Sequence, residues 1–166
     1  MIPYFLSEND CAIVTMDKFS RPEEVHLTLS GDPRPQGCPR YSVRGGRIII
    51  YNPDTPSLRL FRRVVREALG TSARSFVFPE TAYCQVDVTI EIRRPPSHYT
   101  RAGKLRAGMP LFPTAGGDID NYDKFVLDGL QGVVYADDRM VAILYSTKKW
   151  SSTNQGKTII TVQKLN

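Results

Sequence analysis

The sequence of 166 residues contains few cysteines and histidines and has no long apolar run. Its three cysteines, Cys11, Cys38 and Cys84, form no CxxC pair, and its two histidines are far apart, which argues against a zinc site and against a disulfide framework. Reduced thiols in a cytoplasmic protein fit this pattern. The apolar runs are too short for a transmembrane helix, and we expect no secretory signal, because the N-terminus lacks a basic leader and an apolar core.

The composition is that of an ordinary globular protein. Hydrophobic residues make up 41% and charged residues 23% of the chain, which excludes a disordered or coiled-coil protein. At this length we expect one folded domain over residues 25–166, preceded by an N-terminal extension of unknown role over residues 1–24.

The net charge of +5 is spread unevenly along the chain. Residues 34–106 carry a net charge of +9, whereas residues 1–33 and 107–140 each carry −4. A basic block beside a compact acidic block suits a protein that attracts a polyanion and then presents carboxylates to it. A basic surface that only keeps the protein in solution is the alternative, and the charge alone does not separate the two.

The apolar pattern predicts both strands and helices. Apolar alternation and β-branched runs predict strands at residues 25–30, 47–51, 83–93, 139–150 and 157–165. The Gly45-Gly46 turn is expected to pair the strand at 47–51 with an adjacent strand before it. Helical spacing predicts helices at residues 55–69, with Thr55 as N-cap, and at residues 121–130. Strands and helices do not strictly alternate, so the prediction is an α+β domain with a mixed sheet and two main helices.

Basic residues gather in two other segments. The Pro- and Gly-rich stretch 94–117 is expected to be a long loop without an element of its own, and its basic and aromatic side chains are compatible with gripping nucleic acid. The helix at 55–69 carries four arginines that line either a phosphate-binding face or an ordinary solvated face: Arg59, Arg62, Arg63 and Arg66.

The most informative stretch is the acidic run GDIDNYDKFVLDGLQGVVYADD. In an extended segment Asp118 and Asp120 point to the same side, and a helix that begins there places Lys124 on the face of Asp120. Asp137 and Asp138 come just before a strand. A helix followed by a short return is expected to bring this turn back toward Asp118 and Asp120.

Such a cluster of carboxylates has a definite chemistry. Three carboxylates close together stay ionised only if a cation joins them. Hard oxygen ligands select Mg²⁺ or Mn²⁺, and such an ion polarises a phosphodiester and lowers the pKa of a bound water. A lysine on the same face can stabilise the charge that develops on the phosphate. The pattern therefore fits metal-dependent phosphodiester hydrolysis.

Two simpler interpretations stay open at this point. Asp118 and Asp120 can serve only to cap the helix, and the pair Asp137-Asp138 can be only a turn. A calcium-binding EF-hand loop does not fit, because Tyr122 stands where that loop needs an oxygen ligand and Asp123 where it needs glycine.

The acidic run resembles the signature of the RusA-like Holliday-junction resolvases, D-x-D-N-x-x-K-x-x-x-D-x-L-x-G-x-x-x-x-D-D. In addition, GDPRPQGCPRYSVRGGRIIIYNPDTPSLRLF resembles the opening strand, Pro/Arg-rich loop and second strand of that family. Together the two matches cover most of residues 25–150. The resemblance implies a small α+β endonuclease that acts as a homodimer, requires Mg²⁺ (or Mn²⁺) and cuts four-way DNA junctions by paired nicks in recombination and repair. It also implies a cytoplasmic protein of bacterial or phage origin that associates with the nucleoid while it acts.

The resemblance also assigns roles to single residues. The implied catalytic residues, of which the three aspartates also hold the metal, are Asp118, Asp120, Lys124 and Asp138. Asn121 and Asp128 match the motif and are expected to be structural, and Asp137 is a secondary candidate. Asp123 lies outside the pattern, and we expect it to be solvated.

Contacts to nucleic acid are expected from six basic residues: Arg34, Arg40, Arg44, Arg101, Lys104 and Arg106.

Two features depart from the family pattern. Gly116-Gly117 precedes the first aspartate where proline is common, and we expect it to loosen the approach loop. Cys38 stands where a basic residue is often found, so one phosphate contact is expected to be missing.

The dimer suits the substrate, because a four-way junction has approximate twofold symmetry and a twofold dimer presents one active site to each of two opposed strands. Two other functions stay open: a nuclease for other branched nucleic acids such as forks and flaps, and a DNA-binding module without catalysis. A phosphate-monoester hydrolase is disfavoured by the surplus of arginine over a long stretch.

Overall fold

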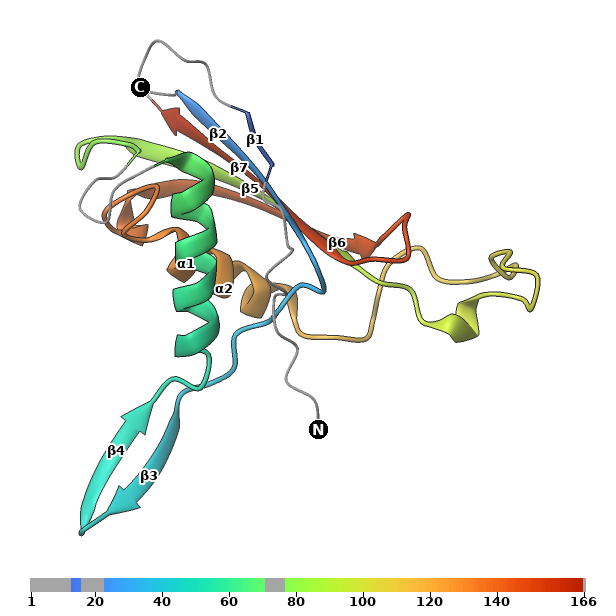
Figure 1. Cartoon of the computed structure of the whole chain (residues 1–166), viewed down its shortest axis with the longest axis horizontal. Helices are drawn as coiled ribbons and strands as arrows, with labels where there is room; N and C mark the ends of the chain where they lie inside the picture. The colour runs from blue at the N-terminus through green and yellow to red at the C-terminus, as the bar shows by residue number, and fades with distance from the viewer. Residues whose placement is uncertain (1–12, 16–22, 71–76, 166) are drawn as a thin grey trace.

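The computed structural model describes residues 13–15, 23–70 and 77–165. A five-stranded mixed sheet, in the order β1-β2-β7-β5-β6, carries two helices on one of its faces (Figure 1). The strands of this sheet are β1 (Ile13–Thr15), β2 (Glu24–Ser30), β5 (Tyr83–Ile92), β6 (Val141–Trp150) and β7 (Lys157–Leu165). The helices are α1 (Thr55–Leu69) and α2 (Ile119–Leu130). This architecture confirms the predicted α+β fold with a mixed sheet and two main helices.

Three smaller elements complete the chain. A separate hairpin of β3 (Arg40–Arg44) and β4 (Arg47–Tyr51) turns at Gly45-Gly46, and Figure 1 shows it extending away from the helices and the sheet. Two short 3₁₀ helices, η1 (Pro96–His98) and η2 (Asp138–Met140), lie in the connections on either side of α2.

The pairing of β5 with β6 is the one parallel pair in the described sheet, and it fixes the position of α2. Two parallel strands need a crossover connection, and α2 forms the helical part of this one. The helix therefore runs back along the sheet, with its N-terminus over the C-terminal half of β6. The hydrogen bond from Ser146 Oγ to Asp123 Oδ1, 2.6 Å long, is consistent with this direction.

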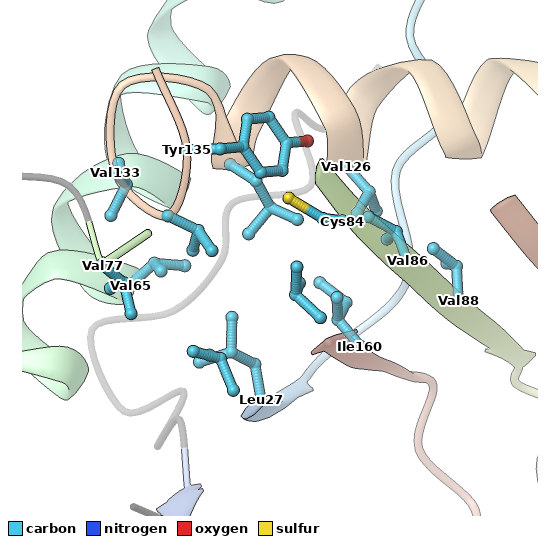
Figure 2. Packing of buried hydrophobic residues seen from close by; sticks show 14 of the residues in the cluster. Leu27, Val65, Val77, Cys84, Val86, Val88, Val126, Val133, Tyr135 and Ile160 are labelled. Carbon is cyan, nitrogen blue, oxygen red and sulfur yellow. The ribbon is translucent and has the colours of Figure 1, made fainter. Parts of the chain in front are cut away.

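The core fills the space between the helices and the sheet. The apolar stripe predicted for the first helix, Leu58, Phe61, Val65 and Leu69, is buried as expected. Figure 2 shows Val86 and Val88 of β5, Ile160 of β7 and Leu27 of β2 in one buried cluster. The same cluster contains Val65 of α1 and Val126 of α2. Tyr135 is fully buried, and its hydroxyl donates a hydrogen bond of 3.1 Å to the carbonyl of Leu127 in α2.

The start of α1 differs from the prediction. Its N-cap is Asp54 and not Thr55, and the Asp54 carboxylate makes no capping hydrogen bond within the helix. Both oxygens of Asp54 accept hydrogen bonds from the loop at residues 31–40 instead: Oδ1 from the Arg34 guanidinium and Oδ2 from the Gly37 N–H. The helix ends as predicted at Gly70, which has the left-handed conformation that glycine adopts without strain (φ 61°).

Two of the four arginines in α1 have internal partners. Arg62 Nη2 donates to the carbonyl of Asp128 at 2.6 Å, and Arg66 Nη2 donates to the carbonyl of Gly132 at 3.0 Å. The carbonyl of Asp128 lies in the last turn of α2, where helix carbonyls lack partners of their own, and that of Gly132 lies in the turn just after the helix. The other two, Arg59 and Arg63, are exposed. The four arginines therefore do not form one phosphate-binding face.

The stretch 94–117 is a loop that projects from the end of the sheet (Figure 1), as expected, but it does contain an element, the 3₁₀ helix η1. Its base is held by Trp150, the last residue of β6. The His98 ring meets the Trp150 ring edge to face with 5.1 Å between centroids, and the Arg94 guanidinium lies 5.4 Å from the same ring. His98 thus anchors the loop.

Most of the predicted N-terminal extension lies outside the described residues, but Ile13–Thr15 pairs with β2 at the edge of the sheet. Cys38 and Cys84 are free thiols, whereas Cys11 lies outside the described residues. Burial raises the pKa of the Cys84 thiol to about 11, so this cysteine is not a nucleophile at neutral pH. No helix in the described ranges is long and apolar enough to cross a membrane.

We predict that Gly129→Ala destabilises the protein by about 1–2 kcal/mol, because a methyl group there overpacks the helix contact. A Cβ at Gly129 would lie 2.5 Å from Cδ1 of Phe61, and that ring is buried and packed edge to face on Phe125. In an unconstrained helix the same change stabilises by about 0.5–1 kcal/mol. Urea unfolding measures the difference.

The matched control is Glu67→Ala, which places alanine at an exposed position of α1. Its free energy of unfolding is expected to change by less than about 0.5 kcal/mol. A Gly129→Ala variant as stable as the wild type would show that α1 and α2 do not need this close approach.

Candidate active site

The N-terminal end of α2 carries three exposed charged side chains. Asp118 is the N-cap, with an extended backbone (φ −68°, ψ 151°), and its carboxylate makes no capping hydrogen bond. Asp120 lies in the first turn, and Lys124 follows one turn later on the same face. Asp118 thus occupies the N-cap position of α2, as one of the two simpler interpretations has it, but its carboxylate does not bond the helix backbone. The helix begins two residues earlier than predicted, at Ile119.

The backbone before Asp118 is fixed from three sides. The N–H of Gly117 donates to the Tyr122 hydroxyl at 3.2 Å, and the Lys148 ammonium donates to the carbonyl of Gly117 at 2.9 Å. A Cβ at Gly117 would lie 2.5 Å from the Cβ of Pro35, so no larger residue fits there. The expectation that Gly116-Gly117 loosens the approach loop is wrong, because glycine at 117 permits close packing.

The Pro/Arg-rich loop at residues 31–40 packs on the same helix. The N–H of Gln36 donates to the carbonyl of Asn121, and its side-chain amide donates to Asp128 Oδ2, both at 2.9 Å. Asp128 thus has a structural partner. Arg34, predicted to contact nucleic acid, donates to the buried Asp54 at 2.6 Å. This ion pair holds the loop against the start of α1.

Asp123 differs from the prediction that it is solvated. It is buried and accepts the hydrogen bond from Ser146 of β6. Burial raises the pKa of the Asp123 carboxyl, the Ser146 hydroxyl lowers it, and the negative charge of Asp120 raises it again. The N-terminal end of α2 thus carries the buried carboxyl of Asp123 beside the exposed carboxylate of Asp120.

Asp137 and Asp138 lie near the other end of the helix. Asp137 accepts from the backbone N–H and the guanidinium of Arg139, which lowers the pKa of its carboxyl. Asp138 is exposed. Burial raises the pKa of Tyr135, and charge interactions with Cys84, Asp138 and Asp128 raise it further. Asp138 comes just before the start of β6, which lies at the end of α2 away from Asp123.

The expected return of Asp138 to Asp118 and Asp120 does not occur. Gly117, next to Asp118, is held by Lys148 in the C-terminal half of β6, whereas Asp138 precedes the start of β6 at Val141. Seven strand residues span about 23 Å. Over residues 13–15, 23–70 and 77–165, no three His, Cys, Asp or Glu side chains are placed to hold one metal ion. The assignment of these three aspartates to a shared ion stays a prediction.

The donor set at α2 fits a hard cation even so. Asp118 and Asp120 are exposed and lie two residues apart in the sequence, and each offers carboxylate oxygens. Mg²⁺ commonly uses only one or two carboxylates and completes its shell with water and substrate phosphate. The pair therefore fits a Mg²⁺ ion that is shared with a bound phosphodiester, rather than a cage formed by protein alone.

Basic side chains are carried by two projections, whose stems meet at this end of the helix. The hairpin carries Arg40 and Arg44, and the loop at 94–117 carries Arg101, Lys104 and Arg106; all five are exposed. The stems of the two projections meet where Pro35 packs against Gly117, directly before Asp118. The stems of the two predicted DNA-binding segments thus lie beside the start of α2 with Asp118 and Asp120, whereas Asp138 lies apart.

Sequence reasoning missed two basic residues here. Arg47 lies directly opposite Arg44 in the hairpin, a register that the Gly45-Gly46 turn signals. Lys148, which holds Gly117, lies in a strand predicted only from its apolar alternation, and nothing in the sequence marks it.

Comparison with known proteins identifies relatives over most of the chain. A family model described as the endodeoxyribonuclease RusA matches residues 30–163, a range that contains every candidate site residue named above. The protein named uncharacterized protein YqaN, from Bacillus subtilis (strain 168), is 32% identical over 132 residues. The match covers 76% of this chain and 88% of that protein.

We predict that the wild type becomes less stable as the pH rises and Asp123 ionises, and that the Asp123→Asn variant does not show this decrease. A raised folded-state pKa means that the folded protein binds a proton that the unfolded chain has released, so ionisation of Asp123 costs folding free energy. The loss begins near the ordinary pKa of 3.8 and is complete above the raised value. Asparagine keeps an oxygen that accepts from Ser146 but never ionises.

Urea unfolding between about pH 3.5 and 7 measures this difference. The stability of the variant relative to the wild type is expected to rise with pH. Glu80→Gln, at an exposed position, serves as the control and should show no such trend. Parallel curves for Asp123→Asn and the wild type would contradict a perturbed carboxyl at this position.

Proposed function

The chain belongs to the RusA endodeoxyribonuclease family, and we propose that it is a Mg²⁺-dependent endonuclease that cuts four-way DNA junctions in recombination and repair. The observation that carries the proposal is the N-terminal end of α2, where Asp118 and Asp120 present free carboxylates and Lys124 lies one turn further along. The family motif and the local geometry point to the same residues.

The proposed chemistry divides among these side chains. Asp118 and Asp120 would hold the metal ion, which when bound polarises the scissile phosphate and lowers the pKa of a water molecule. The Lys124 ammonium would donate to a phosphate oxygen as negative charge develops on it. Lys148 keeps the backbone of Gly117, and with it the start of α2, in place. Mn²⁺ offers the same hard-ligand chemistry and is a possible substitute.

The two basic projections would position the DNA. In the hairpin Arg44 and Arg47 lie directly opposite each other, an arrangement that is unfavourable for like charges unless an anion lies between or beside them. A phosphate supplies that anion, and phosphate contacts fix the register of a protein on DNA without reading its sequence. Since both projections rise from the contact of Pro35 with Gly117, DNA held by them would pass close to Asp118.

The proposed active form is a homodimer. Paired cuts on opposed strands of a junction need two active sites related by a twofold axis. One chain carries one such site at the start of α2, so two chains would supply the pair.

The proposal is tested with synthetic four-way, forked and linear duplex DNA, each with and without Mg²⁺. We expect symmetric nicks in the four-way junction that appear only with the metal, and little cleavage of the linear duplex. Preferred cleavage of forks or flaps would favour a nuclease for other branched DNA. Binding without cleavage of any substrate would favour a DNA-binding module.

We predict that Asp120→Asn abolishes cleavage but keeps junction binding. The change removes a charge that would hold the metal, and it also reduces the repulsion of the DNA backbone, so affinity should hold or rise. Gel-shift titration and cleavage on the same junction measure both effects. Asp87→Asn, on β5, is the matched control and should cut like the wild type.

Asp138→Asn belongs to the same experiment, because Asp138 lies apart from the other two aspartates within the chain. A loss of cleavage equal to that of Asp120→Asn would support its predicted role in the assembled enzyme. If Asp120→Asn itself cuts at the normal rate, the proposed site is wrong.

We predict that Lys124→Ala slows cleavage by about 100-fold or more, the size of effect seen when a donor to a developing oxyanion is lost. An ordinary surface pair with Asp120 would contribute only about 0.3–0.5 kcal/mol to stability and nothing to the rate. Single-turnover cleavage at saturating protein and Mg²⁺ separates the chemical step from binding.

Lys164→Ala, on β7, is the control and removes an exposed ion pair with Glu23. Its rate should be unchanged. A decrease of less than about threefold for a folded Lys124→Ala variant would remove Lys124 from the catalytic residues.

A further inference from the structure

The hairpin of β3 and β4 has two chemically different faces. Residues directly opposite each other in an antiparallel pair share a face, and successive residues alternate between faces. The register pairs Tyr41 with Ile50 and Val43 with Ile48. These four residues make up one side, which we call the apolar face, and it carries no charge.

The opposite side, which we call the basic face, is formed by the remaining pairs: Arg40 with Tyr51, Ser42 with Ile49, and Arg44 with Arg47. All three charges of the hairpin therefore lie on one side of a ribbon that is only two strands wide. This separation follows from the alternation of the sequence and from the register that the glycine turn sets.

The apolar face is unusually exposed. Tyr41, Val43, Ile48 and Ile50 are 64–76% exposed, whereas the apolar residues on the basic face, Ile49 and Tyr51, are 44% and 46% exposed. Nothing in the described part of the chain covers the apolar face. A two-stranded hairpin is at best marginally stable alone in water, and contiguous apolar patches of this kind mark interaction sites.

We propose that the apolar face is a contact surface between two copies of this chain, with hairpin packed on hairpin about a twofold axis. The inference deepens the proposed function and rests on it in one respect, the assignment of the basic face to DNA phosphates. Because the charges lie on the other side, pairing the apolar faces brings no like charges together. It also directs the two basic faces outward in opposite directions, where each can meet a different arm of a branched DNA.

The dimensions of the hairpin agree with this role. It extends clear of the sheet and helices, so the bodies of two copies do not prevent their hairpins from meeting (Figure 1). Pairing the apolar faces buries roughly 1,000 Å² in total, which is at the lower bound for a specific interface. The hairpin contact alone is thus expected to give a dimer of modest affinity, which the binding of both copies to one DNA molecule would strengthen.

The chain offers a matched pair of variants, because Ile48 and Ile50 lie on the apolar face and Ile49, between them, lies on the basic face. Glutamine is uncharged and does not disturb phosphate contacts. We expect the wild type to have twice its chain mass of 18.7 kDa in sedimentation equilibrium. The double variant Ile48→Gln/Ile50→Gln should dissociate at least about tenfold more readily, as when central contacts of an interface are lost. Ile49→Gln should dimerise like the wild type.

Two results would overturn the inference: a wild type that stays monomeric at about 100 µM, or a double variant that dimerises as tightly as the wild type. Far-UV circular dichroism and thermal unfolding check that the variants fold. Should the double variant not fold, the single variant Val43→Gln, which changes the partner of Ile48, replaces it. A monomeric wild type whose double variant loses junction binding, while Ile49→Gln keeps it, would instead assign the apolar face to DNA.

Junction cleavage by the wild type, assayed separately, distinguishes this inference from the proposed function. A dimer that depends on the apolar face but cuts no DNA would contradict the proposed function alone. A monomer that cuts junctions would contradict the dimer contact and the proposed dimeric active form, but it would leave the proposed nuclease activity in place.

Discussion

The close packing around Gly117 is the constraint on which the arrangement of this molecule depends. Three segments that are distant in sequence meet there: Pro35 of the Pro/Arg-rich loop, Lys148 of β6, and the end of the long loop with the first turn of α2, which carries Tyr122. A side chain at 117 would separate Pro35 from the helix, and the carbonyl of Gly117 would lose the ammonium that binds it. The position of Asp118 follows directly, because it is the next residue of a backbone that is held from three sides.

The parallel pairing of β5 with β6 has the second large consequence. The crossover places α2 antiparallel to β6, so the start of the helix lies over the end of the strand, and Asp138, which precedes the strand, lies near the other end of the helix. The same topology gathers both loops of predicted DNA contact at the start of α2. In the proposed site, Asp118 and Asp120 would hold the metal ion and a substrate phosphate would complete its shell.

Charge in this chain serves two different purposes that composition does not separate. Arg34, Arg62 and Arg66 belong to the basic block, yet each is bonded within the fold, to a buried carboxylate or to the free carbonyls at the end of a helix. Arg40, Arg44, Arg101, Lys104 and Arg106 are exposed on the two projections. The surface available to a polyanion is therefore smaller than the net charge of the block suggests, but it is concentrated on segments that extend from the body.

The sequence by itself determined the features that depend on near neighbours in the chain. The apolar stripe of α1, its end at Gly70, the alternating strands and the pairing of Asp120 with Lys124 on one helix face all follow from local periodicity and were predicted. The family motif could be identified for the same reason, because its spacing is local. Tertiary structure decided what depends on distant partners. Asp123 is buried because β6 brings Ser146 to it, and Asp54 turns away from its helix because Arg34 and Gly37 bind it. Asp138 is kept from Asp118 and Asp120 by a crossover whose direction no local pattern encodes, since 48 residues separate the two strands that set it.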